Sequence, residues 1–165
     1  MLTADRQFTL RPVQPGDEDL LYRIYASTRA EELAPVNWTD EQKETFLRMQ
    51  FNAQTVHYLN YFPNAEYQII QRQEGIPAGR LITDRSEASI FLIDVALLPE
   101  HRQLGIGTNI MKSLLEEAVR KNEPIILHVE TFNPARKLYE RLGFIKTGET
   151  GIYHEMTWTP GGKSA

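Results

Sequence analysis

The residues of this chain with the clearest chemical potential form a short segment from Arg102 to Thr108, with the sequence R-Q-L-G-I-G-T. Gly105 and Gly107 have no side chain, so the backbone can turn sharply there and present several N–H groups to an anion. A helix is expected to begin within this segment and to add the positive end of its dipole. Arg102 would add a guanidinium group suited to phosphate oxygens. The segment predicts a phosphate-binding loop, while a plain strand-to-helix turn would use the same two glycines.

Two common phosphate-binding motifs do not fit this segment. The dinucleotide fingerprint G-x-G-x-x-G requires a third glycine where this chain has Ile110. The P-loop G-x-x-x-x-G-K-(S/T) is absent, because no glycine pair precedes Lys-Ser or Lys-Thr at the required spacing. The remaining pattern, R-x-x-G-x-G-T between a strand and a helix, resembles the pyrophosphate loop of the GNAT superfamily of N-acetyltransferases, written (Q/R)-x-x-G-x-(G/A).

A second segment, from Leu127 to Phe144, strengthens this resemblance. Its sequence, LHVETFNPARKLYERLGF, is similar to the second acyl-CoA-binding half of the same superfamily, in which a strand ends at Asn and a short helix carries Tyr. Asn133 is a good helix N-cap and Pro134 suits the first helical position, whereas Gly143 ends the helix. Tyr139 could also be an ordinary core tyrosine, but both halves occur here in the right order, which favours the functional interpretation.

The resemblance implies acetyl-CoA as the cofactor and indicates the residues that bind it. Backbone groups of Ala96 and Leu97, at the end of a predicted strand, would pair with the pantetheine arm like an added β-strand. Asn133 would reach the pantetheine arm or the splay between two strands. Lys137 or Arg141 would meet the adenosine 3′-phosphate or simply face solvent. The pyrophosphate would be held mainly by backbone N–H groups of Arg102, Gln103, Leu104, Gly105, Ile106, Gly107 and Thr108.

The resemblance also implies the reaction, in which an amine attacks the thioester directly within a ternary complex. The chain contains no cysteine, so no cysteine thiol can carry the acyl group. A backbone N–H near Leu97 would stabilise the oxyanion. Tyr139, placed beside the sulfur, would act as the general acid that protonates the departing thiolate.

The base that removes the amine proton is not determined by the resemblance. Several GNAT enzymes carry Glu or His at positions that match Phe91 or Ile93, both apolar here. Strand alternation places Asp94 opposite Ile93 unless a bulge intervenes. His128 stands in the middle of an L-x-V pattern where relatives that acetylate protein N-termini carry a glutamate. Two routes stay open, His128 as a catalytic base or water-mediated removal with Glu66 or Glu130 at a distance.

Aromatic residues in the first half of the chain are candidates for binding the acceptor. Trp38, Phe51 and Tyr58, together with Gln50 and Tyr61, could form a pocket that holds an amine cation against aromatic ring faces. The same residues could instead pack a helix onto the sheet. The expected function is N-acetylation of a primary amine of a small molecule or peptide. Two alternatives are a non-catalytic acyl-CoA-binding regulatory module, which would explain the missing family base, and an interaction protein without a cofactor.

Composition limits the other classes of partner. The chain has 165 residues, 41% hydrophobic, which suits a single domain over residues 1–158 followed by a flexible tail over 159–165. A net charge of −4 offers no general basic field for nucleic acid or an anionic membrane. With no apolar run near about 20 residues and no signal peptide, a cytoplasmic protein is expected. The four histidines share no ligand spacing, so no metal site is expected. Contacts of a homodimer would be sought in residues 144–158.

Hydrophobic periodicity predicts the elements that must position these residues. Thr39 and Gln42 form a capping box for a long helix reaching Tyr61, with an apolar stripe of Phe46, Met49, Ala53 and Val56. The order β-α-α-β-β-β-α-β-α-β-β matches the GNAT fold, a mixed α+β (α/β) fold whose mostly antiparallel, splayed central sheet is flanked by helices. The other helices are expected over 17–29, 107–121 and 134–142, and the strands over 8–11, 67–72, 78–84, 89–97, 125–129, 144–148 and 153–158.

Overall fold

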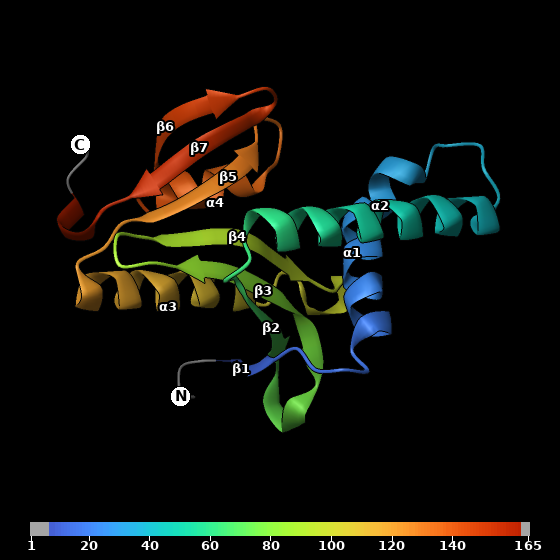
Figure 1. Cartoon of the computed structure of the whole chain (residues 1–165), viewed down its shortest axis with the longest axis horizontal. Helices are drawn as coiled ribbons and strands as arrows, with labels where there is room; N and C mark the ends of the chain where they lie inside the picture. Colours follow the sequence, from blue (N-terminus) through green and yellow to red (C-terminus); the bar gives the residue numbers. More distant parts are fainter. Residues whose placement is uncertain (1–6, 163–165) are drawn as a thin grey trace.

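Among residues 7–162, which the computed structural model of the protein describes, seven strands form one sheet in the order β1-β2-β3-β4-β5-β7-β6 (Figure 1). Every neighbouring pair is antiparallel except β4 with β5. The predicted mixed fold with a mostly antiparallel sheet is therefore confirmed. The strands are β1 (Thr9–Pro12), β2 (Glu66–Gln71), β3 (Pro77–Arg85), β4 (Ile90–Leu97), β5 (Ile125–Glu130), β6 (Ile145–Thr150) and β7 (Tyr153–Trp158).

Helices cover both faces of this sheet, and all four lie where the sequence predicts them (Figure 1). The predicted capping box is present: Thr39 Oγ1 accepts from Gln42 N at 3.1 Å, and Gln42 Oε1 accepts from Thr39 N at 2.9 Å. The helices are α1 (Glu18–Leu33), α2 (Asp40–Tyr61), α3 (Ile106–Lys121) and α4 (Ala135–Arg141).

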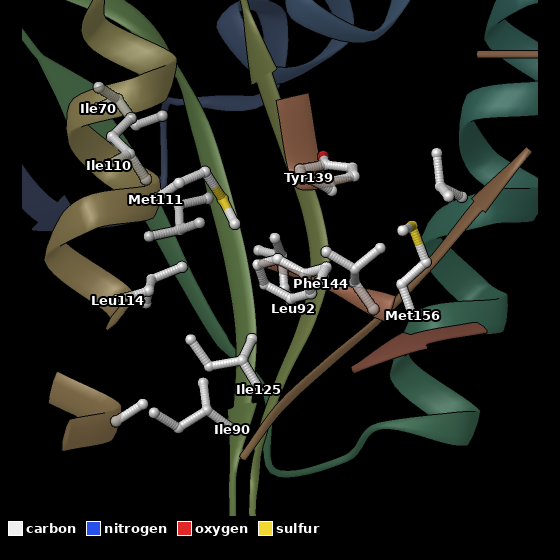
Figure 2. Close-up of a cluster of buried hydrophobic side chains, with 14 of the residues drawn as sticks. Ile70, Ile90, Leu92, Ile110, Met111, Leu114, Ile125, Tyr139, Phe144 and Met156 are labelled. Carbon is white, nitrogen blue, oxygen red and sulfur yellow. The ribbon is translucent and has the colours of Figure 1, made fainter. Parts of the chain in front are cut away.

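The main hydrophobic core lies between the sheet and helices α3 and α4 (Figure 2). The inward face of α3 is the predicted one, because Ile110, Leu114 and Ala118 are all buried. Figure 2 shows Tyr139 of α4 in the same cluster as Leu92 of β4. This packing anchors α4, and with it Tyr139, against the sheet.

The inward face of α2 differs from the predicted one. Met49 and Val56, two members of the predicted stripe, are 62% and 57% exposed. The buried or half-buried face instead carries Leu47, Phe51 and Tyr58 and includes polar residues. An apolar stripe could not identify this face, because the helix turns polar as well as apolar side chains toward the sheet.

Strand β4 contains a β-bulge and separates from its parallel neighbour. It pairs with β5 only over Ile90–Leu92, so the two strands diverge beyond that point. Along β3 the register shifts: Ile82 pairs with Asp94 and Thr83 with Leu92, which leaves Ile93 as the extra residue. The bulge reverses the alternation of the strand. Val95 and Leu97 therefore pack against the α3 side, like Leu92, whereas Asp94 turns toward α2.

The predicted flexible tail is described only in part. Pro160–Gly162 forms a short 3-10 turn, and the remaining tail residues, 163–165, lie outside the described part of the chain. None of the helices within residues 7–162 is both long and apolar enough to span a membrane.

Candidate active site

A cavity of about 1030 Å³ opens where β4 and β5 diverge. Its walls come from these two strands, from the C-terminal parts of α1 and α2, and from the start of α4. Several residues that are far apart in the sequence therefore meet at one hollow between the diverging strands. The predicted site residues that line it are Tyr58, Ala96, Leu97, Arg102, His128, Asn133 and Tyr139.

The predicted phosphate loop has the backbone geometry expected of it. Gly105 is the N-cap of α3 with φ +82°, a left-handed conformation that favours glycine. Within the described residues, the backbone N–H groups of residues 103–108 donate to no acceptor. A Cβ added at Gly107 would find its nearest neighbour, Leu97 Cδ1, at 3.9 Å, so the backbone there is open. Free N–H groups at a helix N-terminus fit a pyrophosphate group.

The side chain of Arg102 is turned toward the end of β4. Its Nε donates to the Leu97 carbonyl oxygen at 2.9 Å, and its Nη2 donates to Ser27 Oγ on α1 at 3.3 Å. The guanidinium group therefore links the strand end to α1. Among the described residues no acceptor contacts its Nη1, and the contact of this side chain with phosphate stays a prediction.

Tyr139 lies at the junction of the core and the cavity. Its side chain is buried, and its ring packs against Phe144 at 5.8 Å between centroids. Burial, with a smaller contribution from the charge of Asp94, raises the pKa of Tyr139 to about 12. The phenol therefore keeps its proton at neutral pH. Asn133 fixes the start of this helix, since its Oδ1 accepts from Ala135 N at 2.9 Å.

His128 projects from β5 on the face opposite to its buried neighbours Leu127 and Val129. Its side chain is half exposed, and its ring stands edge-on to Phe91 at 5.3 Å between centroids. Nε2 lies 3.6 Å from Glu155 Oε2 on the adjacent strand β7. The histidine is thus accessible from the cavity and has a carboxylate beside it.

A buried network that the sequence analysis missed lies on the α2 side of the cavity. Arg80 of β3 donates from Nε to Asp94 Oδ2 at 2.6 Å and from Nη2 to Gln54 Oε1 at 2.8 Å. The Arg80 side chain is only 7% exposed, against 26% for Asp94. A signal for it existed, because an arginine inside the apolar run of β3 must find a partner when buried.

The aromatic residues predicted to bind the acceptor separate into two groups. Tyr58 lines the cavity, and burial, reinforced by the charge of Asp94, raises the pKa of its phenol to about 12. Trp38 packs against Phe46 at 5.2 Å between ring centroids, and Phe51 packs against aromatic residues of α1. Neither is among the residues that line the cavity. Of the two glutamates considered near the base, Glu130 lines the cavity, while Glu66 is paired with an arginine of β3.

Comparison with known proteins agrees with this geometry. The sequence model of the acetyltransferase (GNAT) family matches residues 21–144. The fold is similar to that of the PaiA N-acetyltransferase from Thermoplasma acidophilum in complex with coenzyme A, with a TM-score of 0.67, 14% identity, and coverage of 92% of this chain and 98% of that one. It is also similar to the spermidine/spermine N-acetyltransferase SpeG from Vibrio cholerae, with a TM-score of 0.60, 19% identity, and coverage of 93% and 92%.

A third similar structure is an acetyltransferase from Thermus thermophilus, with a TM-score of 0.64, 18% identity, and coverage of 93% of this chain and 97% of that one. No match was found among curated protein sequences. At identities this low, the structural similarities establish a shared fold.

Proposed function

Because the chain belongs to the acetyltransferase (GNAT) family, we propose that it transfers the acetyl group of acetyl-CoA to the primary amine of a small molecule or peptide. Acetyl-CoA is the acyl donor of this family. The observation that carries the proposal is the position of Tyr139, a buried and protonated phenol at the cavity between two diverging strands. A protonated group at this position suits the release of a thiolate leaving group.

The residues that line the cavity and the adjacent loop at the start of α3 suit the parts of the donor. The unpaired backbone N–H groups of residues 103–108 would hold its pyrophosphate. The backbone of Ala96 and Leu97 lines the cavity beyond the last β4–β5 pair and would hold the pantetheine arm as an added strand. Asn133, which caps α4, would stand beside that arm. Acetyl-CoA, when bound, supplies the acetyl group as a reactive thioester.

Two side chains at the cavity would carry out the proton transfers of the reaction. Tyr139 would hold the proton that the departing thiolate requires. His128, half exposed at the cavity with Glu155 beside it, would accept a proton from the amine, directly or through water. The chain has no cysteine, so no cysteine thiol could hold the acetyl group between two steps. The proposed route is direct transfer within a ternary complex, with which the absence of cysteine agrees.

The test is a measurement of thiol release from acetyl-CoA across a panel of primary amines, with mass spectrometry of the amine product. The proposal predicts amine-dependent thiol release and a product carrying one added acetyl group. Binding of acetyl-CoA without thiol release from any amine would contradict it and would favour a regulatory acyl-CoA-binding module. Transfer to hydroxyl groups alone would contradict the assignment of nitrogen as the acceptor atom.

A further inference from the structure

We propose that Asp94 is the group that binds the ammonium of the acceptor, and that the preferred acceptor is therefore a cationic amine. This inference rests on the proposed function and deepens it by assigning a recognition residue and a charge to the second substrate. It starts from the bulge at Ile93, which turns the carboxylate away from the core and into the cavity.

The carboxylate of Asp94 lies where an acceptor must come. It faces the cavity on β4, just before Ala96 and Leu97, whose backbone would hold the donor. Tyr139 of α4 and Tyr58 of α2 line the same cavity as Asp94. An amine bound to Asp94 would therefore stand near the proposed proton donor.

Arg80 orients this carboxylate without occupying both of its oxygens. The guanidinium group lies behind it, almost fully buried, and bonds Oδ2. Gln54 Oε1 accepts a hydrogen bond from Nη2 of the same guanidinium group. Among the described residues, no partner contacts Asp94 Oδ1. One oxygen is thus held by the protein and the other is available to an N–H donor, an arrangement that favours a directional, charge-assisted hydrogen bond.

The other ionised groups of the cavity wall favour a cation as well. Arg29 is paired with Glu32, whereas Arg102 bonds only neutral oxygens of Leu97 and Ser27 and keeps its positive charge. Glu31 and Glu130 also line the cavity, and within residues 7–162 neither has an ion-pair partner. These two carboxylates outweigh the single unpaired positive charge of Arg102, so the net negative charge of the wall would attract a cation.

Aromatic rings at the same wall add a second source of attraction for a cation. Tyr58, Phe62 and Phe91 line the cavity, and the rings of Phe62 and Phe91 lie 5.4 Å apart. Aromatic ring faces attract ammonium groups, and they also pack against the apolar part of a ligand. Asp94 and these rings together fit an amine carried on an apolar or aromatic group.

The test measures binding of benzylamine and of its uncharged analogue benzyl alcohol to the protein loaded with coenzyme A, which prevents turnover. For the wild type, we expect benzylamine to bind at least about tenfold more tightly, as one hydrogen bond to a charged group allows. Asp94→Asn should abolish this preference. Glu130→Gln removes another carboxylate of the same wall, one that would attract the cation without binding it directly, so this matched control should keep most of the preference.

Retention of the preference in Asp94→Asn, or its absence in the wild type, would overturn the inference. A change in melting temperature on adding coenzyme A verifies that each variant is folded. If Asp94→Asn fails to fold because Arg80 is left buried and unpaired, Asp94→Asn with Arg80→Gln removes both charges and tests the same preference. Because this readout is binding, its failure is distinct from failure of acetyl transfer, which the amine panel detects.

Discussion

At the scale of single residues, the environment of Tyr139 decides its chemistry. Desolvation disfavours the phenolate, so the pKa rises from 10.0 to about 12 and the proton is kept throughout the neutral range. A phenol is protonated near pH 7 even at its ordinary pKa of 10.0, and a higher pKa makes it a weaker acid. The assignment of Tyr139 as a proton donor therefore rests on its position at the cavity.

Replacing Tyr139 by Phe keeps the ring in the core and removes the proton donor. We expect kcat for the best amine to fall by about 100-fold, within the usual range for general-acid catalysis. The KM for acetyl-CoA should change little. Steady-state thiol release at saturating amine measures both constants, and an unaltered kcat would exclude Tyr139 as the general acid.

The raised pKa of Tyr139 also predicts how stability depends on alkaline pH. An unfolded tyrosine loses its proton near the ordinary pKa of 10.0, whereas folded Tyr139 keeps it to about 12. The stabilisation is therefore fully present below pH 10 and is lost as the pH rises through this window. Urea unfolding midpoints at pH 9 and pH 11 should fall less in Tyr139→Phe than in the wild type. Tyr61→Phe, at a 71% exposed side chain, is the control and should follow the wild type.

At the scale of elements, the close approach of β3 to β4 shapes the strand end that would bind the donor. Gly79 pairs with Leu97, and a Cβ at Gly79 would lie 2.0 Å from the Ala96 carbonyl oxygen. Gly79→Ala must therefore push the two strands apart. We expect a loss of about 1 to 3 kcal/mol in the free energy of unfolding and a higher KM for acetyl-CoA.

Gly148→Ala on β6 provides the matched control for Gly79→Ala. There the added Cβ would meet its nearest atom, Glu155 Cβ, at 3.5 Å, which is ordinary contact. Denaturant unfolding should separate the two variants clearly. Equal stability of the two, with an unchanged KM for acetyl-CoA in Gly79→Ala, would show that this strand contact is dispensable.

Elements whose sequence signals lie in residues close together in the chain could be predicted. Features that depend on contacts between residues of different strands could not. The capping box at Thr39 and the buried face of α3 follow from residues close together in the chain. The bulge at Ile93 depends on how β4 pairs with β3, so the sequence could give the direction of Asp94 only on the condition that no bulge intervened. Arg80 itself was a signal for a buried partner, but that partner could not be identified from the sequence, since the pair forms only across two strands.

At the scale of the whole molecule, the cavity is assembled from elements spread along most of the chain. The proposed donor half would come from β4, β5 and α4, where two recognisable segments indicated it in the sequence. The proposed acceptor half would come from α1 and α2, where the resemblance is weakest. Trp38 and Phe51 were placed at the cavity from their aromatic character, but aromatic rings also suit helix packing, and the structure uses both in that way.

The most direct test is thermal unfolding with and without saturating acetyl-CoA in the wild type, Gly105→Glu and Gly16→Glu. Both glycines have positive φ, +82° and +100°, but only Gly105 lies in the phosphate loop. Ligand linkage predicts a rise of several degrees in the wild type and in Gly16→Glu. It predicts no rise in the melting temperature of Gly105→Glu, whose side chain would bring a negative charge to the phosphate loop. No rise in the wild type at millimolar acetyl-CoA, or an equal rise in all three proteins, would contradict a donor site at this loop.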